Sequence, residues 1–287
     1  MLTIKTVGII AKPGVAQAER LVPELIEWLE ARGISARCDE YAAAYANRTE
    51  FHSRESVPDG ADLVIVLGGD GTLLAAARAI GGRETPLLPV NLGGLGFLTA
   101  MTVEELFPEL ERAFRNEHRI AKRRFLDCQI VRGDRPVAEY RALNDVVVTK
   151  ASIARMIDIE AYIDNQFMCA YKADGLIVST PTGSTAYSLS AGGPIIFPSV
   201  GALCITPICP HMLTNRPVIV PETSVVSLVC RAEDGAAYLT IDGQVGEPLK
   251  KGDQVLCHSS SHVLRLVRPP KMRFFDVLRD KLKWGER

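Results

Sequence analysis

The sequence predicts an α/β N-terminal domain with a doubly wound, mostly parallel sheet, followed by a β-rich, sandwich-like C-terminal domain. Two observations lead to this fold class. From residue 1 to 122, short apolar runs alternate with helical patterns, and glycines stand where the runs end. This alternation is typical of a doubly wound sheet. From residue 123 to 271, apolar runs are short, partly alternating and separated by turn residues, as in antiparallel sheets.

The N-terminal domain is expected to contain three strands and three helices. The strands are expected within 7–14, 62–69 and 86–94, and the helices within 18–33, 71–82 and 102–117. Residues 63–67 form a continuous apolar run, which indicates a strand buried on both faces. Gly33 is placed to end the first helix, and Pro23 inside it indicates either a kink or a later start.

The C-terminal domain is expected to contain mainly strands. These are expected within 124–133, 156–165, 226–235, 236–243, 253–260 and 262–270. Residues 179–194 interrupt this pattern. The last segment, 272–287, is expected to form a helix that packs back on the N-terminal domain, because Phe275, Val277, Leu278 and Leu282 form an apolar stripe.

Composition narrows the class of protein. The 287 residues carry a net charge of −1, which argues against nucleic acid or an anionic membrane as the main partner. The seven cysteines contain no Cys-x-x-Cys pair and are expected to be reduced core residues of a cytoplasmic protein. The first residues lack the pattern of a signal peptide, and no apolar run approaches the roughly 18 residues of a membrane helix.

The turn at 68–72, Gly-Gly-Asp-Gly-Thr, is the first candidate site. Glycines at the carboxyl end of a parallel strand let the backbone approach a phosphate, and the amides that open the next helix point at the anion. A carboxylate beside phosphates must act on a proton or a cation, so Asp70 is a candidate general base or metal-linked group. The alternative is a tight turn in which Asp70 caps the helix.

Two further motifs follow strand ends or precede strands. The stretch 91–98, Asn-Leu-Gly-Gly-Leu-Gly-Phe-Leu, is either a second place where backbone approaches a ligand or a loop packed under Phe97. Asn144 and Asp145 precede an apolar run. Asn144 has the geometry to pair with an adenine edge and Asp145 to accept from ribose hydroxyls, or the two residues form a simple turn.

The stretch 172–194 carries the densest group of hydroxyl side chains in the chain. Serines and threonines surround Gly183 and the pair Gly192–Gly193, a composition suited to phosphates and ribose. A flexible linker would not carry Tyr187 and Leu189 between apolar runs. Two groups of cysteine and histidine, within 257–262 and 204–211, lack zinc-site spacing and are interpreted as strand and turn residues.

Together these motifs resemble the bacterial NAD kinases, a family that phosphorylates the 2′-hydroxyl of the adenosine ribose of NAD. The resemblance rests on GGDGT at 68–72, NLGGLGFLT at 91–99, LNDVVV at 143–148, the stretch 174–194 and DGQ at 242–244. It implies NAD and ATP (or polyphosphate) as substrates, a divalent metal ion carried with ATP, expected to be Mg²⁺, and a homodimer or homotetramer.

The resemblance also implies roles for individual residues. Asp70 corresponds to the proton acceptor, and no residue is assigned as a metal ligand. The positions implied to bind NAD or ATP are Gly68, Gly69, Gly71, Thr72, Asn144, Asp145, Arg155, Lys172, Asp174, Thr185, Ala186, Tyr187, Ser188, Leu189, Ser190 and Gln244. The chain departs from the family pattern at Asp145, where glutamate is usual, and at Ala173, where glycine is common.

Two other functions are compatible with parts of the sequence. A lipid kinase of the diacylglycerol type would share the Gly-Gly-Asp-Gly turn but would not need the hydroxyl-rich stretch. A dinucleotide-binding sensor without activity would need the hydroxyl-rich stretch but not Asp70. The combined motifs favour an NAD kinase, in which Asp70 takes the proton from the 2′-hydroxyl as it attacks the γ-phosphate.

Overall fold

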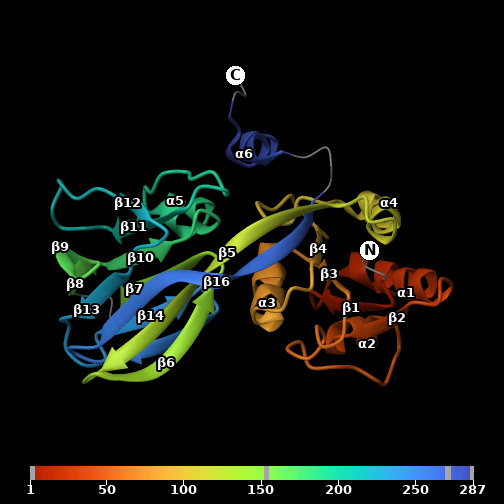
Figure 1. The fold of residues 1–287 in the computed structure, drawn as a ribbon, viewed down its shortest axis with the longest axis horizontal. Helices are drawn as coiled ribbons and strands as arrows, with labels where there is room; N and C mark the ends of the chain where they lie inside the picture. Colours follow the sequence, from red (N-terminus) through yellow and green to blue (C-terminus); the bar gives the residue numbers. More distant parts are fainter. Residues whose placement is uncertain (1–3, 152–154, 269–272, 285–287) are drawn as a thin grey trace. The chain divides into compact units, whose positions relative to one another are not determined.

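The computed structural model describes residues 4–151, 155–268 and 273–284 (Figure 1). The chain divides into two compact units. The first comprises residues 1–122 and 264–287, and the second comprises residues 123–263. Among the described residues, no helix is long and apolar enough to cross a membrane.

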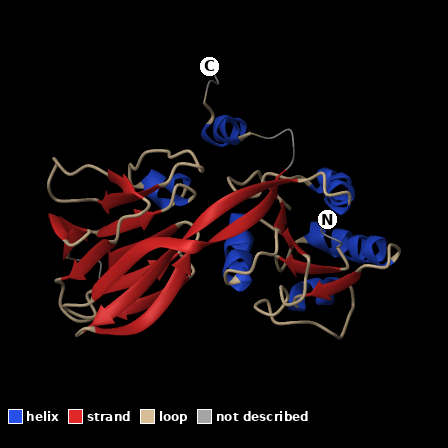
Figure 2. Cartoon of the chain, in the orientation of Figure 1, coloured by secondary structure: helices blue, strands red, loops and turns tan. Residues whose placement is uncertain are grey.

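The described residues of the first unit form a parallel sheet and five helices. Figure 2 distinguishes the helices (blue) from the strands (red). The strands are β1 (Thr6–Ala11), β2 (Ser35–Cys38), β3 (Leu63–Leu67) and β4 (Leu87–Val90). The helices are α1 (Ala16–Glu30), α2 (Glu40–Tyr45), α3 (Asp70–Ile80), α4 (Val103–Phe114) and α6 (Phe274–Leu282). The strand order is β2-β1-β3-β4, and each of these pairs is parallel. The predicted α/β class is therefore confirmed.

The apolar sequence of β3, the central strand of this sheet, follows from its burial. Every residue of β3 is buried, as expected for a strand covered on both faces. The helix α1 runs through Pro23, so the later start considered from the sequence is wrong. The sequence interpretation missed β2 and α2, which are only four and six residues long and show little periodicity.

The second unit consists mainly of two antiparallel sheets. One has the order β12-β11-β10-β7-β14-β15, and the other contains β16-β13-β8-β9 with β5 and β6. The strands of the first sheet are β7 (Asp145–Lys150), β10 (Gly175–Ser179), β11 (Ala202–Ile208), β12 (Val218–Pro221), β14 (Ala237–Ile241) and β15 (Val245–Leu249). Those of the second are β5 (Arg119–Arg132), β6 (Arg135–Ala142), β8 (Ile157–Ile163), β9 (Gln166–Ala173), β13 (Val226–Cys230) and β16 (Gln254–Arg268).

Side chains from both sheets form one apolar core in the second unit. Val148 and Leu176 of one sheet share this core with Ile159, Leu228 and Val255 of the other. The β-rich, sandwich-like prediction for this half is therefore confirmed. The two strands expected within 253–260 and 262–270 are one continuous strand, β16, which runs through the serines at 259–261; residues 269 and 270 lie outside the described residues.

The division into units departs from the sequence boundaries at one place. The N-terminal part of the first unit ends at Lys122, as expected. The second unit ends at Val263 and not at 271, because the end of β16 belongs to the first unit, where Leu266 pairs with Leu87 of β4. The helix expected within 272–287 is α6, which belongs to the first unit. Val277 and Leu278 are buried, but Phe275, expected in the same stripe, is 55% exposed.

Candidate active site

Asp70 lies where β3 ends and α3 begins. Gly69 is the N-cap residue of α3, and Asp70 is the first residue of the helix. A Cβ atom on Gly68 would overlap the side chain of Thr72, so the first turn of α3 can approach the strand end only because residue 68 is glycine. The need for glycine at position 68 therefore comes from packing against Thr72 within the turn. Gly71, by contrast, is exposed.

The Asp70 carboxylate is bound by the loop that follows β4. Its Oδ2 accepts from the backbone N–H of Phe97 at 2.9 Å, and its Oδ1 accepts from the N–H groups of Leu98 at 3.1 Å and Thr99 at 3.0 Å. Oδ1 also accepts from the Thr99 hydroxyl at 2.9 Å. The helix-capping interpretation of Asp70 is therefore wrong, because Gly69 is the N-cap residue and the bonds of the Asp70 carboxylate among the described residues go to residues 97–99.

The glycine-rich loop is shaped around this carboxylate. A Cβ atom on Gly96 would overlap both Oδ1 of Asp70 and the hydroxyl oxygen of Thr99. Asn91, 8% exposed, donates from Nδ2 to the carbonyl oxygen of Gly94 and to the hydroxyl oxygen of Thr99, both at 2.9 Å. The structure thus gives the loop 91–98 a role that neither sequence interpretation named: it receives the side chain of Asp70, and Phe97 contributes its backbone amide. The approach of this loop to a ligand stays a prediction.

In the second unit, Asn144 and Asp145 stand at the start of β7, opposite the end of β10. Asp145 pairs with Ser179 across this antiparallel strand pair, so the two side chains lie on one face of the sheet. The carboxylate of Asp242 accepts from the N–H groups of Leu143 at 2.9 Å, Asn144 at 2.7 Å and Asp145 at 3.1 Å. Asp242 therefore fixes the backbone of the Asn-Asp pair.

The Asp145 carboxyl group is buried beside another acid. Asp145 is 4% exposed. Burial, and to a smaller degree the negative charge of Asp242, raises the pKa of Asp145 from its usual 3.8 to about 7. The neighbouring polar atoms Oδ1 of Asn144 and Oγ of Ser179 are also buried and have no hydrogen-bond partner among the described residues. This group of polar atoms has the capacity to bind a polar ligand.

The stretch after β10 is locked against the Asn-Asp pair by its own hydroxyl groups. Thr180 donates its hydroxyl to the carbonyl oxygen of Leu143 at 2.6 Å. A Cβ atom on Gly183 would overlap the backbone of Asn144, so this close approach requires glycine. Ser184 donates to the carbonyl oxygen of Pro181 and accepts from the N–H of Ile196 at 2.9 Å. These bonds hold the segment as a rigid turn, which excludes a flexible linker.

The short helix α5 (Tyr187–Ser190) presents some of the predicted NAD-binding residues outward and others inward. Ser188 is fully buried and its hydroxyl lies 2.9 Å from that of Thr206 on β11, so it anchors the helix to the sheet. Thr185 is buried and donates to the carbonyl oxygen of Thr182. Tyr187 and Ser190 are exposed, while Ala186 and Leu189 are half-buried. The ligand-facing candidates in this segment are thus the outward residues.

The remaining predicted residues of the second unit lie at both ends of the β7–β10 strand pair. Exposed Gln244 follows β14, near the end that carries Asp145. Asp174 lies at the other end, beyond Gly175, which pairs with Thr149. This is at least four residues of strand, about 13 Å, from Asp145.

At the end of the β7–β10 strand pair away from Asp145, the negative charge of Asp174 is paired with the positive charge of Lys150. Lys150 Nζ lies 2.7 Å from Oδ1 of Asp174, and both side chains are partly exposed. Lys172, at the end of β9, is exposed, as is Arg155. The sequence interpretation did not identify Lys150 as the partner of Asp174.

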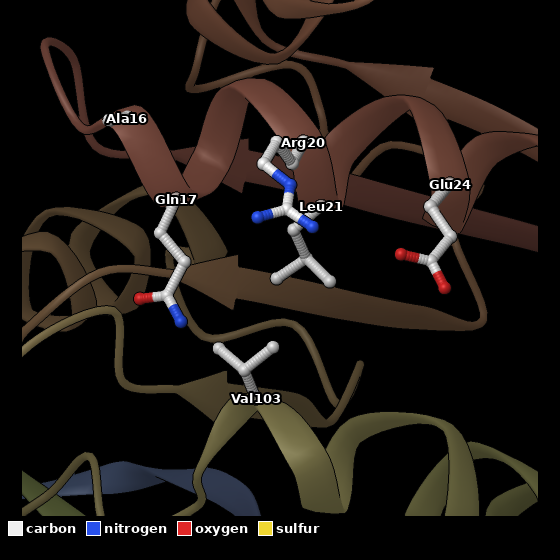
Figure 3. Close-up of a pocket in the computed structure, with 6 residues that line it drawn as sticks. All are labelled: Ala16, Gln17, Arg20, Leu21, Glu24 and Val103. Atoms are coloured by element: carbon white, nitrogen blue, oxygen red, sulfur yellow. The ribbon is translucent and has the colours of Figure 1, made fainter.

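Several surface pockets lie outside these clusters. One, of about 360 Å³, is lined by Ala16, Gln17, Arg20, Leu21, Glu24 and Val103, and Figure 3 shows the polar side chains of α1 on one side of it and Val103 on the other. None of these residues was predicted for the site. Among the described residues, no group of three or more histidine, cysteine, aspartate or glutamate side chains is arranged to hold a metal ion.

Both cysteine–histidine groups of the sequence are explained by strand geometry. Within β16, Cys257 is buried and His258 is exposed, since alternate residues face opposite sides of a strand. Cys204 is buried within β11, whereas Cys209 and His211 are exposed beyond its end. These placements agree with their interpretation as strand and turn residues.

Sequence reasoning missed the residues that hold the candidate site together. Thr99 and Gly96 lie in the quoted stretch 91–99, and Asp242 opens the quoted stretch 242–244, but no role was assigned to them. The sequence pointed to these residues only because they lie within the two motifs. Their function depends on partners 26 to 99 residues away in the chain, which a sequence pattern does not identify.

Comparisons with known proteins find matches along nearly the whole chain. The ATP-NAD kinase N-terminal domain family matches residues 7–118, and the ATP-NAD kinase C-terminal domain family matches residues 143–269. The chain is 66% identical to the NAD kinase of Solibacter usitatus over 287 residues, covering 100% of both proteins. It is 47% identical to the NAD kinase of Koribacter versatilis, covering 99% of this chain and 100% of that protein.

Solved structures show the same fold. A crystal structure of yeast NADH kinase complexed with NADH has a TM-score of 0.92 and 25% identity, covering 99% of this chain and 89% of that one. An NAD kinase from Archaeoglobus fulgidus in complex with ATP has a TM-score of 0.79 and 23% identity, covering 97% of this chain and 98% of that one. With both domain families matched in order and close relatives aligned from end to end, the chain belongs to the NAD kinase family.

Proposed function

We propose that Asp70 is the general base with which this member of the NAD kinase family phosphorylates NAD to NADP. The 2′-hydroxyl of the adenosine ribose gives its proton to Asp70 while its oxygen forms a bond to the γ-phosphorus of ATP. The bond from that phosphorus to the bridging oxygen breaks, ADP leaves, and the protonated Asp70 returns its proton to solvent. Such a transfer depends mainly on positioning and electrostatics.

The single observation that supports this role is the arrangement of donors around the Asp70 carboxylate. A carboxylate offers about four acceptor positions. Among the described residues, Oδ1 accepts three hydrogen bonds and Oδ2 accepts one, from Phe97. Oδ2 therefore retains capacity to accept a further hydrogen bond or a proton.

The second unit supplies the proposed NAD-binding groups. Asn144 and Asp145 are held by Asp242, and Oδ1 of Asn144 is a buried acceptor without a partner among the described residues. We assign the adenosine portion of NAD to this pair. The outward residues Tyr187 and Ser190 of α5 offer an aromatic face and a hydroxyl for the same dinucleotide.

ATP is proposed to bring the divalent metal ion, Mg²⁺, with its phosphates; polyphosphate is the alternative donor. Mg²⁺ keeps several waters and needs only one or two protein carboxylates when phosphates are present. When bound, the ion offsets phosphate charge. Gly71, an exposed residue in the first turn of α3, is proposed to lie beside the phosphates, because the positive end of the helix dipole is there.

One assay tests the proposal directly. The protein is incubated with NAD, Mg²⁺ and either ATP or polyphosphate, and NADP is measured with an NADP-specific dehydrogenase. NADP formation by the wild-type protein and its loss in Asp70→Asn are the expected results. Wild-type turnover in a folded Asp70→Asn protein would remove Asp70 from the reaction. The lipid kinase and the inactive sensor gain no support, because the relatives matched along the whole chain are NAD kinases.

We further propose a cytoplasmic homodimer or homotetramer. All seven cysteines are free, which suits a reducing compartment. The second unit exposes several large apolar side chains, and Leu213 is 91% exposed; the others are Phe197, Val200, Met212 and Ile219. Contact between subunits would cover this apolar surface. Light scattering coupled to gel filtration distinguishes the monomer, which would contradict the proposal, from either assembly.

A further inference from the structure

Thr99 is completely buried and belongs to a chain of hydrogen bonds that ends on Asp70. Nδ2 of Asn91 lies 2.9 Å from the Thr99 hydroxyl oxygen, and that oxygen lies 2.9 Å from Oδ1 of Asp70. The orientation of the Asn91 amide is fixed by backbone partners. Its Nδ2 donates to the carbonyl oxygen of Gly94 at 2.9 Å, and its Oδ1 accepts from the N–H of Gly93 at 2.7 Å.

These contacts determine the direction of the Thr99 hydroxyl group. A threonine hydroxyl has one hydrogen to donate, and its oxygen accepts from others. An ionised carboxylate is only an acceptor, so the 2.9 Å contact requires the Thr99 hydrogen to point to Oδ1 of Asp70. The Thr99 oxygen then accepts from Nδ2 of Asn91, which shares its two hydrogens among this oxygen and the carbonyl oxygens of Gly94 and Thr99. Together with the N–H groups of Leu98 and Thr99, the Thr99 hydroxyl occupies Oδ1 with three donors.

The consequence is a difference between the two oxygens of one carboxylate. Oδ1 has more donors than lone pairs, whereas Oδ2 accepts only from Phe97 among the described residues. Rotation of the carboxylate would exchange the two oxygens. Three donors from residues 98 and 99 oppose that rotation, and the lack of a side chain at Gly96 leaves the space in which Oδ1 sits.

We propose that Thr99, oriented by Asn91, is a positioning residue that makes Oδ2 of Asp70 the proton-accepting oxygen. This inference rests on the proposed role of Asp70 as general base. The proton of the 2′-hydroxyl passes to Oδ2, while Oδ1 stays bound to its three donors throughout the transfer. Thr99 is fully buried and its hydroxyl bonds to Oδ1, not Oδ2, so its effect passes through Asp70.

Four proteins test the inference in a double-mutant cycle: wild type, Thr99→Val, Asp70→Asn and the double variant. Valine keeps the shape of threonine and removes the hydroxyl donor. In the wild-type background, Thr99→Val should lower kcat roughly 10- to 100-fold, the range for one hydrogen bond to a charged group. KM for NAD should change less than about threefold, and Thr99→Ser should restore most of kcat. In the Asp70→Asn background, Thr99→Val should change kcat less than about twofold.

A pH profile adds a readout that a purely structural role would not affect. Without the hydroxyl donor, the acidic limb of the kcat profile should move to higher pH in Thr99→Val and stay in place in Thr99→Ser. Thr85→Val is the matched control, since Thr85 of the same unit donates its hydroxyl to the carbonyl oxygen of Ala61 and has no part in the site. Its kcat and pH profile should match the wild type.

The outcomes separate the inference from the function on which it rests. An equal loss in both backgrounds, or no loss in the wild-type background, would overturn the positioning role while leaving Asp70 as the base. Near-wild-type turnover of Asp70→Asn would overturn the proposed function itself. Thermal unfolding and calorimetric binding of NAD identify a variant that fails to fold. If Thr99→Val does so, Asn91→Ser, which removes the donor that orients the Thr99 hydroxyl, carries the same test through the pH profile, and Thr99→Ser is its control.

Discussion

Asp145 and Asp242 are joined by two hydrogen bonds, one donated by each residue's backbone N–H. The N–H of Asp145 donates to Oδ1 of Asp242 at 3.1 Å, and the N–H of Asp242 donates to the carbonyl oxygen of Asp145 at 3.0 Å. The bonds hold two acidic residues side by side. They place a buried carboxyl group, whose pKa is raised to about 7, at the start of β7.

The first prediction concerns Asp70. Asp70→Asn keeps the shape and part of the hydrogen bonding but cannot take a proton at the amide nitrogen. The variant should lose roughly 10²–10⁴-fold in kcat, the contribution of a positioned general base. NAD binding, measured by calorimetry, should stay within a few-fold of the wild type. A loss of binding as large as the loss of kcat would indicate a damaged site and not a missing base.

The second prediction concerns Gly96. In Gly96→Ala the new Cβ atom would overlap Oδ1 of Asp70 and the Thr99 hydroxyl oxygen, so the carboxylate must move. Overpacking of this kind costs about 1–3 kcal/mol of stability, and the displaced base should lower kcat at least about tenfold. Gly94→Ala is the matched control, because nothing lies within 4 Å of its added atom. Equal unfolding temperatures for the two variants would contradict the overlap.

The third prediction is a pH dependence of stability caused by Asp145. Its pKa is 3.8 in ordinary surroundings and about 7 in the folded protein, so the folded state holds the proton more tightly. The resulting stabilisation is complete below about pH 4 and is lost as the pH rises through 7. Asp145→Asn has no such loss.

Urea unfolding without NAD measures this effect at pH 5 and pH 8. Between pH 5 and pH 8, the free energy of unfolding of Asp145→Asn should gain about 2.5 kcal/mol on that of the wild type, because part of the wild-type loss has already occurred below pH 5. Asp134→Asn, at an exposed turn of the same unit, should follow the wild type. A constant difference between Asp145→Asn and wild type at both pH values would show that burial does not retain the proton.

The fourth prediction concerns the contact of Asp145 with NAD. If its carboxylate accepts from ribose hydroxyls, Asp145→Ala should raise KM for NAD by an amount equal to about 1.5–3 kcal/mol. Asp145→Glu should keep most activity, because the longer side chain carries the same group. Steady-state kinetics at pH 8, where the carboxyl group is mostly ionised, is the measurement. An unchanged KM in the alanine variant would show that the side chain does not reach the substrate.

The fifth prediction concerns the choice between NAD⁺ and NADH. We expect Asp174 to favour the positively charged nicotinamide ring of NAD⁺. Lys150, 2.7 Å from Asp174, reduces this preference to less than about tenfold, because partly exposed pairs contribute only about 0.2–1 kcal/mol. The ratio of kcat/KM for NAD⁺ to that for NADH should fall in Asp174→Asn and rise in Lys150→Met. A shift of both variants in the same direction would exclude a response to ring charge.

The sequence by itself determined the architecture of each half of the chain. Alternation of apolar runs with helical patterns fixes which residues are buried, and burial is a local property that a periodic pattern encodes. The same reasoning located the turn 68–72 and the stretch 179–194, because glycines and hydroxyl groups at strand ends have few other uses. It did not separate the roles within these motifs. Ser188 and Tyr187 are neighbours in the sequence, yet one is fully buried and the other is 45% exposed.

The tertiary structure alone decided which groups meet. Asp70 bonds to residues 27 to 29 positions later, and Asp242 bonds to residues 97 to 99 positions earlier. Strand order and register create these contacts, and neither leaves a periodic signal in the chain. The raised pKa of Asp145 has the same origin, since it depends on burial between β10 and β14 and on the nearby Asp242. The chemistry of the site therefore depends on long-range contacts, whereas the elements that carry it follow from local pattern.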